Sequence, residues 1–318
     1  MLYPGRHILV RCMIVIYDKT EHEEEFKEID SPREGCWIHI EDATTHDINQ
    51  ISELIGLEYT DMYDCLDRYE IPRIERIDAH VLIFTRHPIE MEKGLYTTTF
   101  TIILTKNYFI TICTQKSQLI KHFISQKPKL APCQKSKFLI YILLKITQEF
   151  TLQIKKIRTN VLRQEKKMSY VDSRDITNLT LNEEILNQYL SSLIPLRSVL
   201  ESITSGRYTI LYEKDQDLLE DLLNASIQSE ELCSINLRSI RSLRDSYQII
   251  FTNQLNKTIK LLTALTIILS IPTMIASLYG MNVTLPIAGE KHAFSLIVAL
   301  IILISIISLI IFQRKKWL

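Results

Sequence analysis

The 318-residue chain has little glycine and proline, with 7 and 9 copies, and neither occurs from Arg207 to Ile271. Because both residues interrupt helices, their absence predicts one unbroken helix along this stretch. At 1.5 Å per residue such a helix would reach roughly 100 Å, far longer than an ordinary globular helix. The absence of glycine and proline therefore argues against a compact arrangement of short elements in this stretch and predicts a long helical stalk.

The chain also lacks a net charge, because 37 lysines and arginines balance 37 aspartates and glutamates. No basic cluster with interleaved aromatic residues occurs, so we expect no nucleic acid partner. The six cysteines are scattered without a C-x-x-C pair, which argues against a disulfide framework or a structural zinc site. We find no glycine-rich phosphate loop and no catalytic constellation, and therefore expect no enzyme activity.

Two apolar runs without a charged residue stand near the end of the chain, from Leu261 to Leu278 and from Ala293 to Phe312. A bilayer core about 30 Å thick needs roughly 20 apolar helical residues, so both runs are expected to span a membrane. Basic residues precede the first run and follow the second, whereas the loop between them holds only Lys291. This asymmetry predicts a multi-pass protein of the cell (plasma or inner) membrane with both termini in the cytoplasm.

The first part of the chain alternates short β-like runs with helical ones and predicts an α/β domain over residues 1–130. Lys106-Asn107 suits a hairpin turn, Asp47 is expected to cap one helix, and Thr60 is expected to cap a second. Apolar residues then recur at helical spacing and predict a helical hairpin over 131–205. The strands expected in the α/β domain are Ile8 to Tyr17, Cys36 to Ile40, His80 to Thr85, Thr97 to Leu104 and Tyr108 to Cys113.

The remaining segments follow from these patterns: a stalk helix over 206–260, a first transmembrane helix over 261–279, an extracytoplasmic loop over 280–292, a second transmembrane helix over 293–312 and a basic tail over 313–318. The stalk carries a near-heptad stripe, which fits either the core of a helix bundle within the chain or a symmetric coiled coil. The stripe includes Leu218, Leu222, Ala225, Ser229, Leu232, Ile235, Ser239, Leu243, Ser246 and Ile250.

The polar side chains of the first span share one helix face. At 100° per residue they fall within an arc of about 80°, and Asn256 continues the stripe toward the stalk. Hydroxyl groups in membrane helices also bond the carbonyl four residues back, which needs no common face, so we favour lining of an aqueous pore. Two spans cannot enclose such a pore, and this predicts a ring of several copies. The stripe consists of Thr263, Thr266, Ser270, Thr273 and Ser277.

The first span ends in Tyr279-Gly280-Met281-Asn282, a second span follows closely, and the chain closes with Lys315-Lys316-Trp317-Leu318. Together with the long stalk, these features resemble the CorA family of magnesium channels. Pro72-Arg73-Ile74-Glu75 and Ile103-Leu104-Thr105-Lys106-Asn107 look like further family positions, so the resemblance covers essentially the whole chain. It implies a funnel-shaped homopentamer in which the first transmembrane helices line the pore and the second ones surround them.

The resemblance also implies roles for individual residues. Asn282 and the backbone carbonyl of Gly280 would form an uncharged outer ring for hydrated Mg²⁺, within the mouth Tyr279, Gly280, Met281 and Asn282, and Gly280 would permit a turn that a side chain resists. Asn256 falls at the cytosolic pore asparagine of the family, and Thr273 falls at its polar ring. Ile259 and Leu262 match its hydrophobic gate, although helix packing would suit them equally.

The family closes when cytosolic Mg²⁺ binds carboxylates between neighbouring subunits. Counting without gaps places Asp221 at the stalk carboxylate and Asp64 at its partner, so Mg²⁺ is expected as both substrate and regulatory ligand. Without the resemblance, both would be ordinary solvated acids. Tyr63 stands where the family often has a second acid, and Glu290 is either a source of negative charge at the mouth or a solvated loop residue.

These features predict a passive Mg²⁺ channel driven by the membrane potential, with Co²⁺ or Ni²⁺ as further cargo. The partners expected are copies of the same chain, the lipid bilayer and divalent cations. A proton-coupled Zn²⁺ transporter like ZntB is the close alternative, although Met281 favours magnesium and the spacing of His39, His46, His80 and His87 favours surface or hydrogen-bonded roles over ligation. A two-span sensor or scaffold without conduction is the more remote alternative.

Overall fold

The computed structural model describes residues 13–91, 94–165, 171–208, 213–283 and 292–317. The chain divides into two compact units, Met1–Met168 with Asn178–Ser242 and Ser169–Thr177 with Leu243–Leu318. The first unit contains a β-sheet with its covering helices, and the second contains the two apolar helical segments. The combination of an α/β part, a long helix and two apolar C-terminal helices confirms the predicted fold class.

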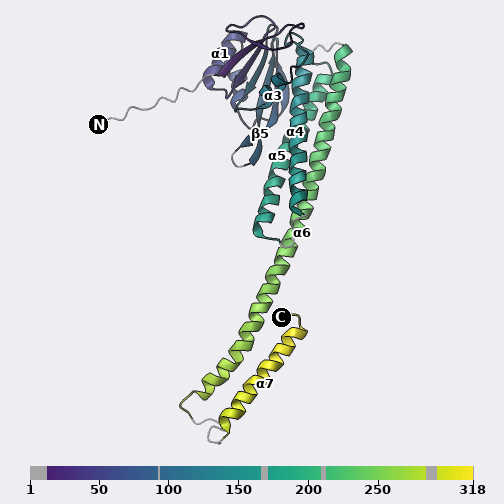
Figure 1. Ribbon diagram of the computed structural model, residues 1–318. Helices are drawn as coiled ribbons and strands as arrows, with labels where there is room; N and C mark the ends of the chain where they lie inside the picture. The colour runs from purple at the N-terminus through teal and green to yellow at the C-terminus, as the bar shows by residue number, and fades with distance from the viewer. Residues whose placement is uncertain (1–12, 92–93, 166–170, 209–212, 284–291, 318) are drawn as a thin grey trace, which may run out of the picture. The chain divides into compact units, whose positions relative to one another are not determined.

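Within the described residues, the strands form one sheet in the order β2-β1-β3-β7-β6-β5-β4 (Figure 1). Neighbouring strands are antiparallel except β3 and β7, which are parallel. The strands are β1 Met13–Asp18, β2 Lys27–Glu28, β3 Trp37–Glu41, β4 Arg73–Ile77, β5 His80–Met91, β6 Gly94–Leu104 and β7 Phe109–Cys113.

The five strands expected from the sequence are present, with Ile8 to Cys12 outside the described residues. The two strands that were not expected, β2 and β4, are the edges of the sheet. Their sequences are Lys-Glu and Arg-Ile-Glu-Arg-Ile, so charged side chains hide the apolar signal that marks an interior strand. Charges on edge strands are a common protection against pairing with other chains.

The predicted hairpin at Lys106-Asn107 joins β6 to β7, where Leu104 pairs with Phe109. The Thr105 hydroxyl fixes this turn, because its oxygen accepts hydrogen bonds from the backbone N–H of Asn107 at 3.2 Å and of Tyr108 at 2.8 Å. The turn therefore depends on a side chain just before it as well as on the two residues at its tip.

Helices begin at different residues from those expected. Helix α1 Thr45–Ile55 has Thr44 as its N-cap. Asp47 is the third helical residue of a capping box, and its carboxylate accepts a hydrogen bond from the Thr44 N–H at 2.8 Å. The expected second helix is split into α2 Tyr59–Met62 and the 3₁₀ helix η1 Tyr63–Leu66. Thr60 lies inside α2 and does not cap it, because Glu58 precedes the helix.

The two sheet faces carry separate cores. On one face α1, α2 and η1 cover apolar residues of β3, β5 and β7, including Ile38, Phe84 and Ile110. On the other face an aromatic cluster forms around Trp37 and Phe138, whose ring centroids lie 5.2 Å apart, next to α3 Leu119–Ser125. Burial on both faces makes the central strands rigid and fixes the loops that follow them.

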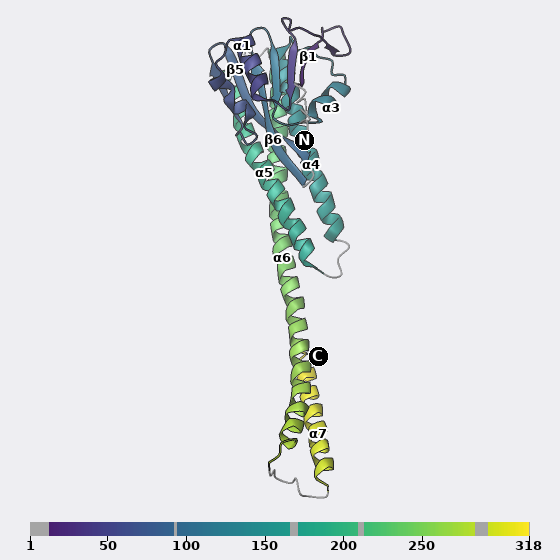
Figure 2. The same cartoon turned by 90° about the vertical axis from the view of Figure 1, so that its left-hand side faces the viewer.

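Three long helices pack against one another in the first unit: α4 Lys135–Glu165, α5 Ser173–Thr204 and the first part of α6 Glu213–Tyr279 (Figures 1 and 2). Phe150 of α4 and Tyr189 of α5 make an edge-on ring contact at 5.3 Å, and Thr151 and Ser229 hydroxyls lie 2.6 Å apart. The bundle reading of the stalk stripe is thus correct for this part. The buried residues in this part of α6 include Leu219, Leu222, Ser226, Ser229, Cys233, Asn236, Leu237 and Ile240.

The buried stripe keeps heptad steps but is displaced by about one residue from the predicted one. Leu222 and Ser229 belong to both, whereas Ile235 is 51% exposed. Two neighbouring stripes of the helix share heptad spacing and both mix apolar with small polar residues, so spacing alone does not decide which one, here the stripe with Ser226 and Asn236, is buried. Large apolar residues of α6 remain on its outer surface.

Candidate functional site

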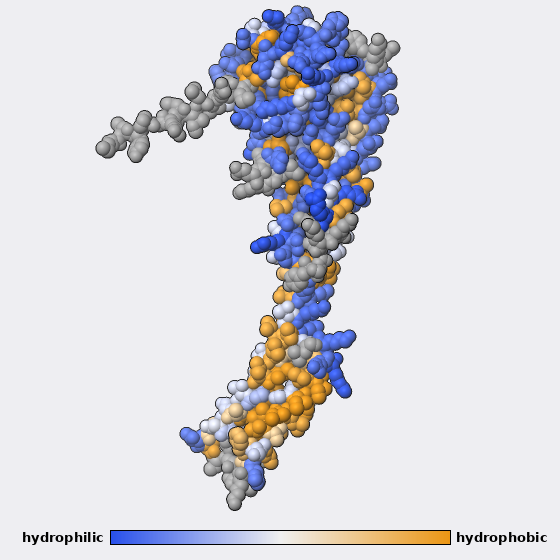
Figure 3. Space-filling view, in the orientation of Figure 1, coloured by the Kyte–Doolittle hydropathy of each residue, from blue (hydrophilic) through white to orange (hydrophobic). Residues whose placement is uncertain are grey.

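The second unit contains two helical segments long and apolar enough to cross a membrane, at the end of α6 and in α7 Ala293–Arg314. Only 6% and 0% of their most apolar stretches are buried, so neither is a core helix of a soluble protein. Figure 3 shows apolar side chains gathered over both. Exposed helices of this kind are stable in lipid, where helical backbone groups are hydrogen-bonded internally.

Helix α7 lies beside the last part of α6 in both views (Figures 1 and 2). On α6 the less exposed residues recur at steps of three and four: Ala264, Ile268, Ile271 and Ile275. On α7 they recur in the same way and include two small polar residues, as is common between membrane helices. These are Ile297, Ile301, Ile304, Ser305, Ser308 and Phe312.

The hydroxyl stripe of α6 lies on another face. At 100° per residue its centre is about 150° around the helix from the face that includes Ala264 and Ile271. All five members are exposed in the single chain. A shallow groove follows the stripe, lined by Thr266, Leu269, Ser270, Thr273, Met274, Ser277 and Leu278.

Two hydroxyls of the stripe also bond their own helix. Thr266 donates to the Leu262 carbonyl at 2.8 Å and Thr273 donates to the Leu269 carbonyl at 2.9 Å. Each hydroxyl oxygen keeps acceptor capacity on the exposed side, so this bond and contact with water are compatible. The alternative reading, that these hydroxyls bond their own helix, is therefore correct for these two residues, and pore lining stays a prediction that the bonds do not oppose.

The tetrapeptide begins at Tyr279, the last residue of α6. The Gly280 N–H donates to the carbonyls of Ala276 at 3.0 Å and Ser277 at 3.2 Å, and the Met281 N–H donates to Leu278 at 3.3 Å. Helical hydrogen bonding thus runs past Tyr279 and ends at the mouth residues. Gly280, Met281 and Asn282 are exposed, and no hydrogen bond of the Asn282 side chain is present within the described residues.

Gly280 does not have the conformation expected of it. Its φ lies outside the left-handed region, and an added Cβ would meet only the carbonyl oxygens of Ala276 at 3.4 Å and Ser277 at 3.5 Å, which are ordinary contact distances. The single chain therefore does not require glycine for this turn, and that expectation was wrong. Glu290 lies outside the described residues.

Asn256, Ile259 and Leu262 are exposed on α6. Ile259 and Leu262 are 51% and 58% exposed, although both are large and apolar. Within the described residues neither is a buried packing residue, which argues against the packing alternative in the single chain. A surface of this kind normally meets another protein surface or lipid.

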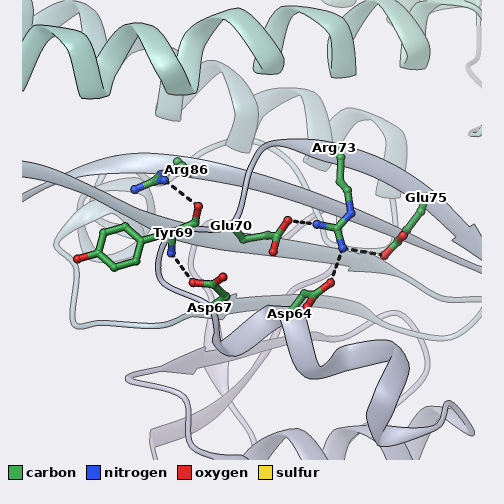
Figure 4. Close-up of polar contacts among 7 residues, drawn as sticks. All are labelled: Asp64, Asp67, Tyr69, Glu70, Arg73, Glu75 and Arg86. Carbon is green, nitrogen blue, oxygen red and sulfur yellow. Dashed lines mark hydrogen bonds and ion pairs between the residues drawn. The ribbon is translucent and has the colours of Figure 1, made fainter.

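Asp64 lies in η1 and is held by an arginine. The Arg73 Nη2 donates to Asp64 Oδ2 at 2.7 Å, Arg73 Nη1 pairs with Glu70, and Glu75 lies 3.5 Å from Nη2 (Figure 4). The same guanidinium stacks on the Phe84 ring at 4.1 Å. Asp64 is thus an ion-paired residue, not the solvated acid that the sequence alone suggested.

Charge is unbalanced around Arg73. Burial raises the pKa of Glu70, Arg73 opposes this, and Asp64 and Asp67 reinforce it. Burial lowers the pKa of Arg73, but the hydrogen bond that it donates to Asp64 and the charges of Glu70 and Glu75 outweigh this effect, so the net direction is upward. Burial and the charges of neighbouring carboxylates thus both act on this cluster.

Asp221 lies on α6 next to the buried Leu222 and is exposed. The described residues provide no ion pair for it. Tyr63 is 59% exposed, and its ring lies 6.0 Å from that of Tyr59. Because it is a tyrosine, it adds no carboxylate beside Asp64. Asp64 and Asp221 thus remain two single acids on different elements.

The histidines have structural positions. His39 and His87 are buried in the sheet, His39 Nδ1 lies 2.8 Å from the Thr111 hydroxyl, and burial lowers the pKa of each to about 4. His46 is exposed and contacts Gln50. No group of three or more histidine, cysteine or carboxylate side chains placed to hold a metal ion occurs among the described residues.

The arrangement of an α/β unit, a long helix, two apolar helices and a Gly-Met-Asn end can now be compared with known proteins. Residues 33–315 match the family model described as CorA-like Mg²⁺ transporter protein. The chain belongs to this family. The match runs from just before β3 to the end of α7.

Individual relatives agree along most of the chain. The cobalt/magnesium transport protein CorA of Methanocaldococcus jannaschii is 28% identical over 288 residues, covering 88% of this chain and 90% of that protein. The protein of the same description from Thermotoga maritima is 22% identical over 297 residues, covering 89% and 83%. The complete structure of the CorA magnesium transporter from M. jannaschii superposes with a TM-score of 0.75 at 25% identity, covering 96% and 98%.

One residue of the site was missed by sequence reasoning. Arg73 lies in the segment Pro72-Arg73-Ile74-Glu75, which was noted only as a family-like string. Its signal was present, because Arg68 and Arg73 stand among Asp64, Asp67, Glu70 and Glu75. Spacing could not say which of these acids Arg73 contacts, since they lie on three segments of chain.

Proposed function

We propose that the chain forms a homopentameric channel that conducts Mg²⁺ passively across the cell membrane, driven by the membrane potential, with Co²⁺ and Ni²⁺ as further cargo. The observation that carries this is the hydroxyl stripe. It is exposed, lies away from the less exposed α6 face, and follows a groove that ends near Gly280 and Asn282. An uncharged oxygen-rich lining suits a cation that keeps its hydration shell.

Several copies are needed because two helices cannot enclose water. The α6 surface before the first span supports this assembly. Ile249, Leu255 and Leu262 are 64%, 51% and 58% exposed in the single chain, and neighbouring copies around a symmetry axis would cover them. We take the number five, and cytoplasmic termini, from the family resemblance and the charge asymmetry.

At the pore mouth, Asn282 and the Gly280 carbonyl would form a ring of uncharged oxygen ligands. Mg²⁺ releases water reluctantly, so a ring that holds the hydrated ion selects it without the cost of dehydration. Gly280 fits this role because its backbone conformation within the single chain does not require glycine. Its missing side chain would instead leave room for neighbouring copies and the ion.

Closure would occur at the other end of the path. Ile259 and Leu262 would form an apolar ring that excludes water when the helices approach one another. Mg²⁺ bound between Asp64 of one copy and Asp221 of the next would hold the closed ring, because it neutralises two facing carboxylates. When cytosolic Mg²⁺ falls, the carboxylates would separate and the pore would open.

The test is flux into liposomes that contain the purified protein, measured with an internal Mg²⁺ indicator. We expect Mg²⁺ uptake that follows an imposed negative-inside potential, and strong loss of uptake in Asn282→Ala. Asn253→Ala is the matched control, because Asn253 lies on the opposite face of α6 from the stripe. Equal uptake by wild type and Asn282→Ala would refute the mouth assignment.

The same liposomes distinguish the alternatives. Zn²⁺ uptake that follows a pH gradient, without Mg²⁺ uptake, would replace the proposal with proton-coupled zinc transport. Absence of uptake for Mg²⁺, Co²⁺, Ni²⁺ and Zn²⁺ by protein shown to be pentameric would indicate a sensor or scaffold.

A further inference from the structure

We propose that Arg73 is a built-in counter-ion that competes with the regulatory cation for Asp64 and thereby sets the Mg²⁺ concentration at which the channel closes. The proposal rests on the proposed function, since it assigns Arg73 a part in the same regulatory site. It concerns a residue of this chain that the Asp64–Asp221 pairing does not include.

The geometry of Asp64 supports competition. Its Oδ2 accepts a charge-assisted hydrogen bond from Arg73 at 2.7 Å, while its side chain is 48% exposed. One side of the carboxylate therefore meets a fixed cation and the other meets solvent. A metal ion that approaches from solvent finds the negative charge already partly neutralised.

Arg73 is held firmly in this position. Glu70 and Glu75 bind the same guanidinium (Figure 4), and the Phe84 ring lies against it, with 4.1 Å between the guanidinium carbon and the ring centroid. Glu70 comes from the segment after η1, and Glu75 comes from β4 beside Arg73 itself. Because these contacts persist without Asp64, Arg73 can release Asp64 to a metal ion and keep its own place.

The charges around Asp64 favour binding of a metal ion even though Arg73 is present. Asp64, Glu70 and Glu75 carry three negative charges against one positive charge, so the cluster retains an excess that attracts a dication. Arg86, the next cation in Figure 4, donates to the backbone carbonyls of Tyr69 and Thr97 at 3.1 Å each and is not paired with Asp64. Arg73 is the cation that Mg²⁺ must outcompete there.

The size of the effect follows from Coulomb's law. A dication about 5 Å from a single positive charge, at the dielectric constant of water, loses roughly tenfold in affinity. Removing the Arg73 charge should therefore lower the half-closing Mg²⁺ concentration by about tenfold. Arg73→Lys keeps the charge on a flexible stem without the bidentate fork, so it should produce a smaller shift in the same direction.

The experiment measures uptake in proteoliposomes as a function of internal Mg²⁺. Arg73→Gln should close at a lower Mg²⁺ concentration than wild type. Arg76→Gln should close as wild type does, because Arg76 lies on the same strand but donates to the Tyr208 carbonyl at 2.8 Å. In the double variant Asp64→Asn with Arg73→Gln, closure should no longer depend on residue 73, since the ligand for which Arg73 competes is gone.

Folding and function are separated by a second measurement. Thermal unfolding of the detergent-solubilised full chain should show Arg73→Gln to be less stable without Mg²⁺ and to gain more than wild type when Mg²⁺ is added. If Arg73→Gln does not fold, Arg73→Lys carries the test. Arg73 variants that close at the wild-type concentration, or at a higher one, would overturn the proposal and make Arg73 a support for the metal site. Wild-type uptake that ignores internal Mg²⁺ would refute the proposed regulation as well, and is recognised without any variant.

Discussion

Acidification should unfold the first unit through two buried histidines. His39 and His87 are 5% and 1% exposed, and burial lowers the pKa of each from 6.5 to about 4. A folded-state pKa below the unfolded value means that the unfolded chain binds more protons between these limits. The stability from keeping both rings neutral is thus complete above pH 6.5 and is lost as the pH falls toward 4.

The magnitude follows from the two pKa values. At pH 5, protonation of the unfolded chain lowers the free energy of unfolding by about 2 kcal/mol for each histidine, and by about 4 kcal/mol for both. A domain is stabilised by only about 5–15 kcal/mol in total, so this loss is large. The groups near the rings do not replace the lost stability, since His39 faces a hydroxyl and a second histidine, and His87 faces a carbonyl and the Ser117 hydroxyl.

The assay is chemical unfolding of the full chain in detergent at pH 7.5 and pH 5.0. The chain has two tryptophans, so Trp317→Phe leaves Trp37, buried beside His39, as the single fluorescent reporter. We expect the pH dependence to fall by about half in His87→Gln and to be unchanged in His46→Gln, whose ring is exposed. Imidazole signals of His39 and His87 that titrate near pH 6.5 in the folded protein would refute the reasoning.

Three further outcomes can be measured in the same preparations. Gly280→Ala should fold with unchanged thermal stability, because an added Cβ has room in the chain. It should lose Mg²⁺ uptake, because the proposed carbonyl ring needs close approach of neighbouring copies. Lower thermal stability would contradict the geometry. Thr273→Val should reduce uptake several-fold by removing one groove hydroxyl, with unchanged helix content by circular dichroism, and full uptake would remove Thr273 from the path. Phe150→Ala should lower the free energy of unfolding by about 3–5 kcal/mol in denaturant titrations, because it leaves a cavity against Tyr189. A loss below about 1 kcal/mol would show that the neighbouring helices move to fill the cavity.

The limits of sequence reasoning are clearest in the sheet and the long helix. Interior strands such as Thr97 to Leu104 were predictable because they are rich in threonine, isoleucine and aromatic residues, which favour β-strands. The edge strands were not, because Arg73 and Glu75 of β4 carry charge that reads as a loop. The stripe on the stalk was displaced for another reason: two neighbouring stripes share heptad spacing, and only packing against α4 and α5 selects the one that includes Ser226 and Asn236.

The sequence by itself determined the two apolar spans, the stripe from Thr263 to Ser277 and the Gly-Met-Asn end, because each depends only on composition and helical periodicity. Only the tertiary structure decided that the less exposed face including Ala264 lies away from that stripe, that Gly280 has room for a Cβ, and that Arg73 holds Asp64. The physical reason is that periodicity fixes which residues share a face, whereas exposure and ion pairing depend on which segments distant in the sequence lie next to that face.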